Sequence, residues 1–397
     1  MKTYDFVIAG AGIFGLSAAL ELTKRKYKVA VLNPNTIPHH LAASTDISKI
    51  VRTEYGSDEL YFRMADICID RWHDWNDLFE EKLYHEAGFL MLCGKSLGSP
   101  EQAYEKAGFD LLKANGYQPE LLGSNEIGER FPAINSNTYP EAVFNPRGGF
   151  VESARVIEKL ATHLRSVGAD LYERQTLSQL IITNGKISGV QTTEGDTFSC
   201  DHLIIAAGAH SPVLLPELKP YIKATGHPVF WLKPEKSAKF SAPQLPVFTA
   251  DISNTGWYGM PFSDKNGVVK IGRHTNGLEL DPDLDDRIIT GSEIQELREF
   301  LAVTFPDLAN SPVVYTRRCL YTDTLDGHFW IDNHPEIKGL TVSTGGSGHG
   351  MKMGPVLGEI TADAAEGRVN EFGDRFKWRH LTEETVQLEE ARFIDKG

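Results

Sequence analysis

The sequence predicts an α/β fold in which a Rossmann-like dinucleotide-binding domain is split along the chain and holds an inserted α+β cap. Three observations predict it. A glycine-rich turn follows an apolar run within the first ten residues and opens a helix-forming segment. A second glycine-rich turn between a strand and a helix lies at residues 345–350. The chain has 397 residues, too many for one small core, so its middle must fold back between the two turns.

The first elements are expected to start a βαβ unit. Residues 4–9 are an apolar run, residues 16–24 have helical composition, and residues 28–32 are rich in valine and alanine. The later helices are expected at 58–79, 125–130, 151–167, 293–304 and from about 355. The later strands are expected at 87–92, 169–172, 180–183, 189–192, 202–207 and 340–343. Glu152 and Ser153 are candidate caps of the helix at 151–167.

Gly10, Gly12 and Gly15 fit the spacing G-x-G-x-x-G. The first glycine permits a tight turn, the second permits close approach to a pyrophosphate, and the third permits close packing of helix on strand. The helix N-terminus attracts the phosphates. A glycine turn without a ligand would give the same letters, but the strand before it and the helix after it favour a dinucleotide site.

Asn33 departs from the usual dinucleotide pattern. An acidic residue is expected at the end of the second strand, where it binds ribose hydroxyls, and asparagine stands there instead. Its side-chain oxygen can still accept a hydrogen bond. Asn33 can equally be a turn former before Pro34, and the sequence leaves both interpretations open.

The second half of the chain favours FAD over NAD. Residues 202–209 resemble the strand and glycine that close over the nucleotide in FAD proteins. The turn at 345–350 precedes a helix, whose free N–H groups and positive dipole end can face an anion such as a reduced flavin. A plain helix cap is the alternative interpretation of that turn.

Three further segments resemble one family of flavoproteins. They are Asp-Ile-Ser-Lys-Ile-Val-Arg at 46–52, Lys-Ile-Gly-Arg-His at 270–274, and Cys-Leu-Tyr-Thr-Asp-Thr-Leu-Asp at 319–326, continued by 329–332 and 347–352. With the N-terminal turn they resemble the monomeric sarcosine oxidase family, within the D-amino-acid-oxidase-like FAD oxidoreductases. That group includes N-methyltryptophan, pipecolate, saccharopine and fructosyl amino acid oxidases. The motifs occur in the same order over nearly the whole chain.

The resemblance implies a discontinuous FAD-binding domain with an inserted antiparallel-sheet substrate domain. We expect residues 1–80, 150–214 and 319–397 to form the FAD-binding domain, and residues 81–149 and 215–318 to form the cap. It also implies flavin attachment through Cys319, which matches the cysteine that forms a thioether to the flavin 8α carbon. A lone cysteine is otherwise more often a buried apolar filler.

Family resemblance also assigns catalytic and substrate-binding residues. Lys270 matches the lysine that activates oxygen, because a fixed cation in a dry pocket stabilises superoxide; an exposed strand lysine is the alternative. Arg52 and Lys352 match the two cations that hold a substrate carboxylate, although either can instead form a structural ion pair. Tyr258, His274 and Tyr321 match pocket residues, and the alternative for an aromatic side chain or a histidine is simple core packing.

The remaining expected residues bind the cofactor. They are Gly10, Gly12, Ile13, Phe14, Gly15, Asn33, Ser44, Ser48, Lys49, Leu177, Gly208, Cys319, Ser347, Gly348, His349, Gly350 and Lys352. Two positions depart from sarcosine oxidases, which carry arginine where Lys49 stands and histidine where Thr45 stands. Fructosyl amino acid and saccharopine oxidases have a similar run at Lys49, so the departures favour an imino acid or an N-alkylated amino acid over sarcosine.

The activity that the resemblance implies is oxidation of a C–N bond of a secondary amine or N-substituted amino acid to an imine, with O2 reduced to H2O2. Three alternatives stay open: a flavin dehydrogenase that passes electrons to a carrier, a flavin-binding protein without turnover, and an NAD-dependent enzyme. No histidine spacing predicts a metal site.

Charge and composition restrict the partners. The formal net charge of −14 disfavours nucleic acid and anionic membranes, so a small amine or amino acid and O2 are the expected partners. The four cysteines fit neither a disulfide scaffold nor a metal site, which favours a reducing compartment. We expect a cytoplasmic protein, since neither a signal peptide, nor a membrane span, nor a terminal Ser-Lys-Leu is read from the sequence. Resemblance to the family suggests a monomer.

Overall fold

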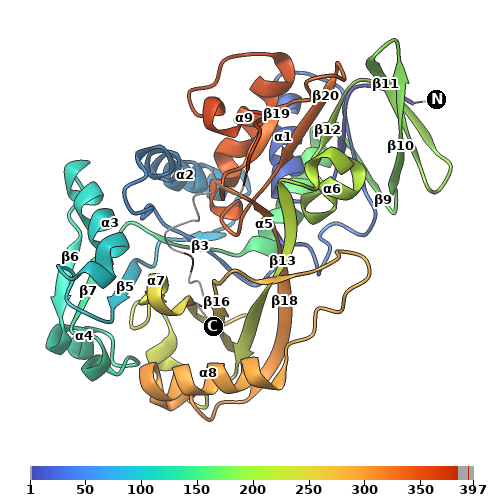
Figure 1. Ribbon diagram of the computed structural model, residues 1–397. Helices are drawn as coiled ribbons and strands as arrows, with labels where there is room; N and C mark the ends of the chain where they lie inside the picture. The colour runs from blue at the N-terminus through green and yellow to red at the C-terminus, as the bar shows by residue number, and fades with distance from the viewer. Residues whose placement is uncertain (1, 383–391, 393–397) are drawn as a thin grey trace.

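A largely parallel eight-stranded sheet is built around the first strand of the chain (Figure 1). In the computed structural model, which describes residues 2–382 and 392, β1 (Lys2–Ala9) lies between β2 (Val29–Asn33) and β12 (Thr197–Ile205), parallel to both. Two more strands extend it in parallel, β9 (Asp170–Glu173) and β20 (Leu340–Thr344). Antiparallel strands complete it: β10 (Leu177–Thr183), β11 (Lys186–Thr192) and β19 (Trp330–Asn333).

Helices from distant parts of the chain pack on one another beside this sheet. Helix α1 (Ile13–Lys24) contacts both α5 (Ser153–Ser166) and α9 (Gly354–Glu366), and α9 also contacts α2 (Glu59–Leu78). Figure 1 shows α9, which is near the end of the described chain, beside the N-terminal α1. Their apolar side chains form one core with the sheet, so segments far apart in the sequence are packed together.

A second, nine-stranded sheet forms from the middle of the chain and is mostly antiparallel. Its strands are β5 (Phe89–Cys93), β6 (Glu120–Gly123), β7 (Glu141–Asn145), β13 (Ile222–Leu232), β14 (Val247–Ala250), β15 (Trp257–Ser263), β16 (Val268–Arg273), β17 (Leu278–Glu279) and β18 (Val313–Thr324). The helices of this part of the chain are α3 (Ala103–Ala114), α4 (Ser124–Arg130), α7 (Ile252–Thr255) and α8 (Gly291–Thr304), whereas α6 (Ser211–Leu214) follows β12 and packs on the core of the first sheet. Only β5 and β14 pair in parallel among the described pairs of this sheet.

Strand β18 is the longest described strand, and it pairs with β13 along nearly its full length. Successive side chains of a strand point to opposite faces. Arg317, Cys319, Tyr321 and Asp323 therefore share one face of β18, and Arg318 lies on the other. A third, small sheet of β3 (Lys49–Val51), β8 (Gly149–Val151) and β4 (Tyr84–His85) lies beside it and carries Lys49.

The expected α/β fold with a Rossmann-like domain and a mainly antiparallel inserted sheet is confirmed. The expected cap at Glu152 is wrong: its carboxylate bonds to His85 and Lys265 and makes no cap, while the Ser153 hydroxyl donates to the carbonyl of Asp46. The expected domain boundaries stay a prediction, and β18 runs across the one at 318/319. Residues 383–391 and 393–397 of the expected FAD-binding domain lie outside the described residues.

We predict that Gly358→Ala destabilises the protein although it improves a helix interior. A Cβ at Gly358 would overlap the backbone carbonyl of Ser17 on α1, and backbone cannot move aside as a flexible side chain can. Helix propensity favours alanine by about 1 kcal/mol, whereas overpacking costs about 1–3 kcal/mol. Chemical denaturation should show a net loss of stability. Gly291→Ala, where a Cβ meets nothing within 4 Å, is the control; equal effects of the two substitutions would contradict the prediction.

Candidate active site

A long cavity opens at the carboxyl ends of β1, β2 and β12, where parallel sheets commonly bind ligands. Its volume is about 440 Å³, within the 300–1000 Å³ range of ligand pockets, and its lining runs from the first glycine turn at Gly10 to the second at Gly350, which suits an extended dinucleotide. The predicted residues that line it are Gly10, Gly12, Ile13, Phe14, Asn33, Ser44, Lys49, Leu177, Gly208, Gly348 and Gly350.

The first glycine turn has the geometry that the motif requires. Gly10 has a φ of +114°, and a Cβ there would overlap the carbonyl of Ala206 at the end of β12. Gly15 does not line the cavity, because it packs against the backbone of Gly10. The N–H of Ile13, at the first turn of α1, donates to the Ser44 hydroxyl at 2.9 Å. A narrow, glycine-walled cradle is therefore present at the helix N-terminus, and it fits a pyrophosphate.

Asn33 shapes the turn that follows β2. Its side-chain nitrogen donates to the carbonyls of Asn35 and Thr36, at 2.8 and 3.2 Å, and its side-chain oxygen accepts from the N–H of Ala11 at 3.2 Å. The turn-forming interpretation is thus supported, and Asn33 also ties the turn to the glycine cradle. Asn33 also lines the long cavity. The structure is therefore compatible with both interpretations of Asn33, as a turn former and as a residue that binds the ribose.

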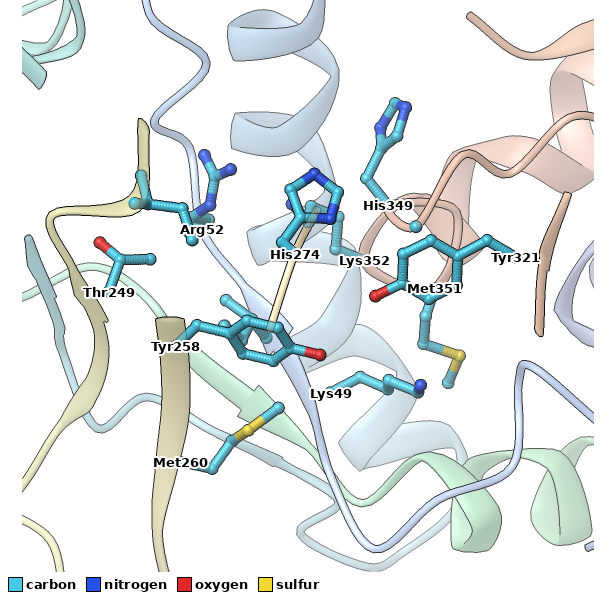
Figure 2. A pocket seen from close by; sticks show the side chains of 13 residues that line it. Lys49, Arg52, Thr249, Tyr258, Met260, His274, Tyr321, His349, Met351 and Lys352 are labelled. Carbon is cyan, nitrogen blue, oxygen red and sulfur yellow. The ribbon is translucent and has the colours of Figure 1, made fainter. Parts of the chain in front are cut away.

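A second, smaller pocket adjoins the long cavity, and Figure 2 shows the side chains that line it. Its described lining is Lys49, Ile50, Arg52, Thr249, Ile252, Tyr258, Met260, His274, Tyr321, Gly348, His349, Met351 and Lys352. Lys49, Tyr321, Gly348 and Met351 line both spaces, so the two meet at these residues. This lining contains basic side chains and no aspartate or glutamate, which favours an anionic ligand.

The two cations predicted to bind a carboxylate, Arg52 and Lys352, both contact the ring of Tyr55. The Arg52 guanidinium lies 5.0 Å from the ring centre of Tyr55, and the Lys352 ammonium lies 4.8 Å from the same ring centre. Cation–π contacts of this kind fix direction at small energetic gain. The Tyr55 hydroxyl in turn lies 3.1 Å from Nδ1 of His349. Arg52 and Lys352 are both buried, so a carboxylate that binds between them is shielded from water.

Two phenols stand on the opposite wall. They are Tyr258 and Tyr321, and Figure 2 shows their hydroxyls pointing toward one another. Burial raises the pKa of both phenols, so both stay protonated at neutral pH and can donate hydrogen bonds. His274 lies 6.1 Å from Tyr321, ring centre to ring centre, and completes this wall.

Lys270 belongs to a buried group of charges centred on Asp46. Lys270 is 1% exposed, so the alternative of an exposed strand lysine is excluded. The ammonium lies 2.7 Å from the Asp46 carboxylate and donates to the carbonyl of Ser48 at 2.5 Å. Arg317 and Lys49 lie 3.6 and 3.8 Å from the same carboxylate. Three cations around one acid leave the group positive.

The charges of this group have unequal effects on its members. Burial lowers the pKa of Lys270 to about 8, in part offset by Asp46. Burial alone would raise the pKa of Asp46, yet Lys270, Lys49 and Arg317 hold it well below its usual range. Asp46 is thus a permanent anion that keeps three cations together in the core.

Cys319 lies against two members of the same group. Its sulfur is 3.6 Å from the Lys49 ammonium and 3.7 Å from the Arg317 guanidinium. Burial would raise the pKa of this thiol, but Lys49 and Arg317 more than offset it, and the net shift is downward. Cys200, which is also buried but has no such neighbours, has a pKa raised to about 12. The surroundings of Cys319 therefore favour a nucleophilic thiolate.

The second glycine turn leads into a short 3-10 helix, Met351–Met353, and then into α9. Gly345 and Gly348 have φ values of +75° and +78°, and Ser347 has a φ of +42°. The Trp72 indole N–H donates to the Lys352 carbonyl at 2.9 Å, which anchors the turn to α2. This turn places Gly348 where the two spaces meet, Gly350 on the long cavity and Lys352 on the smaller pocket.

Several expectations differ from the structure. Among the described residues, Ser48, Cys319, Ser347, His349 and Lys352 do not line the long cavity; His349 and Lys352 line the smaller pocket instead. Sequence reasoning missed Asp46, Tyr55 and Arg317 as site residues. Two signals were available: Asp46 is three residues from Lys49 in the matched segment, and Arg317 alternates with Cys319 and Tyr321 along one strand face.

Other kinds of site are not found in the described part of the chain. It holds no group of three or more His, Cys, Asp or Glu side chains arranged to bind a metal ion. Its helices also include none with the length and apolar character needed to span a bilayer.

The fold and the two adjoining spaces define a dinucleotide-dependent oxidoreductase: a cradle for a pyrophosphate leads to a buried, positively charged reaction pocket. The chain belongs to the family described as FAD dependent oxidoreductase (DAO), whose model matches residues 5–364. FAD is therefore the dinucleotide, and the residues of the cradle fit it.

Named proteins of this family align along almost the whole chain. Monomeric sarcosine oxidase of Bacillus sp. (strain B-0618) is 27% identical over 370 residues, which cover 91% of this chain and 92% of that protein. L-saccharopine oxidase of Schizosaccharomyces pombe is 26% identical, over 94% and 92% of the two chains. The structure of fructosyl amine:oxygen oxidoreductase (Amadoriase I) from Aspergillus fumigatus matches with a TM-score of 0.82 at 23% identity, over 99% of this chain and 94% of that one.

Proposed function

We propose that this protein is an FAD-dependent oxidase that converts the C–N bond of a secondary amine bearing a carboxylate into an imine and reduces O2 to H2O2. The observation that carries the proposal is the placement of Arg52 and Lys352 on Tyr55, in a pocket that adjoins the FAD cavity at Lys49 and Tyr321. The names of the sarcosine, saccharopine and N-methyl-L-tryptophan oxidases that align with the chain support the same chemistry.

Arg52 and Lys352 bind the substrate carboxylate, because a guanidinium and an ammonium in a buried site offer several charge-assisted hydrogen bonds. Carboxylate binding orients the amine toward the opposite wall, where Tyr258, Tyr321 and His274 lie. No acidic group is present in the described lining to hold an ammonium ion, so the pocket favours the neutral amine. A neutral amine can release the electrons of its adjacent C–H bond, whereas its protonated form cannot.

FAD, when bound, accepts a hydride equivalent from the substrate and later passes two electrons to oxygen. The chain contributes position and charge. Gly10, Gly12 and Asn33 hold the nucleotide end, and Gly348 and Gly350 of the second turn line the cavity toward the reacting end. Lys270 supplies a buried cation for the negative charge that forms on oxygen.

We further propose that Cys319 carries FAD covalently. Cys319 would hold the flavin through a thioether to its 8α carbon, and O2 would take up the two hydrogens and two electrons released by that coupling, as H2O2. The contacts of the sulfur with Lys49 and Arg317 support this, since a thiolate is the required nucleophile. Monomeric state and cytoplasmic location are also proposals; the names of the monomeric sarcosine oxidases support the first.

The substrate class is tested with a peroxide assay on sarcosine, pipecolate, saccharopine, N-methyl amino acids and fructosyl amino acids. We predict turnover of at least one of them and none of N-methylalkylamines, which lack a carboxylate. Arg52→Gln should raise KM by about 30-fold or more, because it removes about 2 kcal/mol or more of charged hydrogen bonding. Arg63→Gln, on an exposed arginine paired with Glu371, is the control. Failure of every carboxylated amine to reduce the flavin would contradict the proposal.

Lys270→Met should slow reoxidation of the reduced flavin by about 100-fold or more and leave substrate reduction nearly unchanged. In the wild type, reoxidation should slow as the pH rises through about 8, because Lys270 then loses its proton; this pH step should vanish in the variant. Stopped-flow mixing of anaerobically reduced protein with oxygenated buffer measures both. Lys265→Met, on an exposed lysine, is the control. Slow reoxidation of the wild type would indicate a dehydrogenase instead.

Cys319→Ala should release FAD that the wild-type protein retains through acid precipitation. The physical reason is the loss of the only proposed covalent bond, while the cradle at Gly10 and Asn33 stays intact. Flavin absorbance of the pellet and the supernatant, with the intact protein mass, provides the measurement. Cys200→Ala, on a buried cysteine far from the cation group, should retain the flavin. Wild-type protein whose flavin is fully extracted by acid would exclude the covalent bond without affecting the assignment of FAD.

A further inference from the structure

A buried polar network lies behind the Tyr321 ring. The Asp323 carboxylate accepts two hydrogen bonds from Arg392, 2.6 Å to Oδ2 and 3.0 Å to Oδ1, and a third from the Thr225 hydroxyl at 2.5 Å. Thr225 and His227 come from β13, beside the part of β18 that carries Asp323. The Asp323 and Arg392 side chains are 9% and 8% exposed, so this ion pair belongs to the interior.

The hydrogen bonds of this network determine the state of His227. Burial lowers its pKa to about 4, against the opposing effect of Asp323, so the imidazole is neutral at neutral pH. Three arginine and threonine donors keep Asp323 ionised, and the single Thr225 proton points to it. The Thr225 oxygen, 3.0 Å from Nε2 of His227, must then accept from that nitrogen. The network therefore fixes both the tautomer and the orientation of the His227 ring.

His227 supports one face of Tyr321. The two ring centres are 3.9 Å apart, with the ring planes inclined by 21°, which is a stacked contact. His227 is fully buried and cannot be replaced there by water. A displacement of the imidazole would accordingly be transmitted to the phenol that lines the substrate pocket.

The second glycine turn supports Tyr321 from another side. A Cβ at Gly348 would overlap the Tyr321 ring, so the turn backbone lies directly against it. The preceding residue, Ser347, accepts a hydrogen bond at its carbonyl from Arg392 at 3.4 Å. The hydroxyl of Ser347 lies 3.2 Å from the N–H of Thr324 in β18, which closes the turn on the strand. Both supports of Tyr321 thus lead back to the same guanidinium.

We propose that Arg392 is a positioning residue for substrate binding: by bonding to Asp323 and to the carbonyl of Ser347 it holds Tyr321 between His227 and Gly348. Arg392 does not line the substrate pocket in the described structure, so it acts through Tyr321. The bidentate contact with Asp323 and the third contact with Ser347 need the planar, multiple-donor guanidinium. This role rests on the proposed function, because it takes Tyr321 as a wall of the pocket that binds the carboxylated amine.

The test compares Arg392→Gln and Arg392→Lys with Arg318→Gln in the flavin-containing protein. Arg318 is the matched control: it is a buried arginine of β18 that bonds to Glu293 at 2.8 and 2.7 Å, on the strand face away from Tyr321. Binding of methylthioacetate, in which sulfur replaces the amine of sarcosine, is followed through the flavin absorbance. KM and kcat are measured for the best amine of the panel, and thermal unfolding is measured for each variant.

We expect Arg392→Gln to raise the methylthioacetate Kd and KM by about tenfold, well below the effect of a full 1 Å misplacement in the reacting geometry. The fall in kcat should be smaller. Arg392→Lys should recover part of the affinity, since lysine restores the charge but not the paired donors. Arg318→Gln should lower thermal stability without changing Kd. Equal Kd values for wild type and Arg392→Gln, or equal shifts for both glutamine variants, would overturn the proposal.

A crystal structure of Arg392→Gln separates this proposal from the proposed function. The ring of Tyr321 should move away from His227, whatever substrate the enzyme uses. An unmoved ring would overturn the positioning role even if amines are oxidised. If the ring is displaced in a protein that oxidises no amine, the positioning role of Arg392 is supported and the proposed function is rejected.

Discussion

The buried carboxylate of Asp46 is the constraint on which the reaction site depends. Lys270 is almost fully buried, and Lys49 and Arg317 approach the same oxygen. Three cations brought into a core without an anion would repel one another and lose hydration, at a cost of several kcal/mol for each ion. Asp46 offsets part of that cost. Because it supplies one negative charge against three cations, the group stays net positive. In the proposed mechanism this positive charge favours negative charge in two places, at the sulfur of Cys319 and on oxygen beside Lys270.

The residues that line both spaces shape the cofactor cavity and the smaller pocket at the same time. Lys49, Tyr321, Gly348 and Met351 bound the FAD cavity on one side and the substrate pocket on the other. Their arrangement sets where the reacting ring of the cofactor can lie and how closely a substrate approaches it. Because Gly348 lies against Tyr321, the glycine turn serves the substrate pocket as well as the cofactor. The smaller pocket is thus formed partly by the cofactor-binding domain and partly by the inserted sheet.

Much of the fold was predictable because its signals are local. Gly10, Gly12 and Gly15 follow an apolar strand and open a helix, so their meaning depends only on immediate neighbours. Arg52, Lys270 and Lys352 were recognised from resemblance, and the structure brings Arg52 and Lys352 together on Tyr55 and buries Lys270. Their partners were not predictable in that way. Asp46 meets Lys270 across 224 positions of sequence, and such long-range pairing leaves no periodic signal.

The same reasoning explains what was mistaken or missed. Glu152 stands at the position of a helix cap, but two side chains of other elements, His85 and Lys265, bond to its carboxylate. Lysine generally lies at the surface, whereas Lys270 is buried. Its burial depends on the ion pair with Asp46, which is distant in the sequence. Asn33 left two readings open, and the structure shows it bonding within its own turn and to the glycine cradle. Local sequence patterns predict the helices and strands, whereas ion pairs between residues distant in the sequence determine how the charged side chains of the site are arranged.

The alternation along β18 has a consequence for how this enzyme can change through evolution. Arg317, Cys319, Tyr321 and Asp323 face the site from every second position, and β13 holds the strand in register beside them. Exchange of one of the four side chains leaves the other three on the same face of the strand. Insertion or deletion of one residue would instead turn the four to the opposite face of the strand together. Substrate preference can therefore diverge at β18 through substitutions, but not through insertions or deletions.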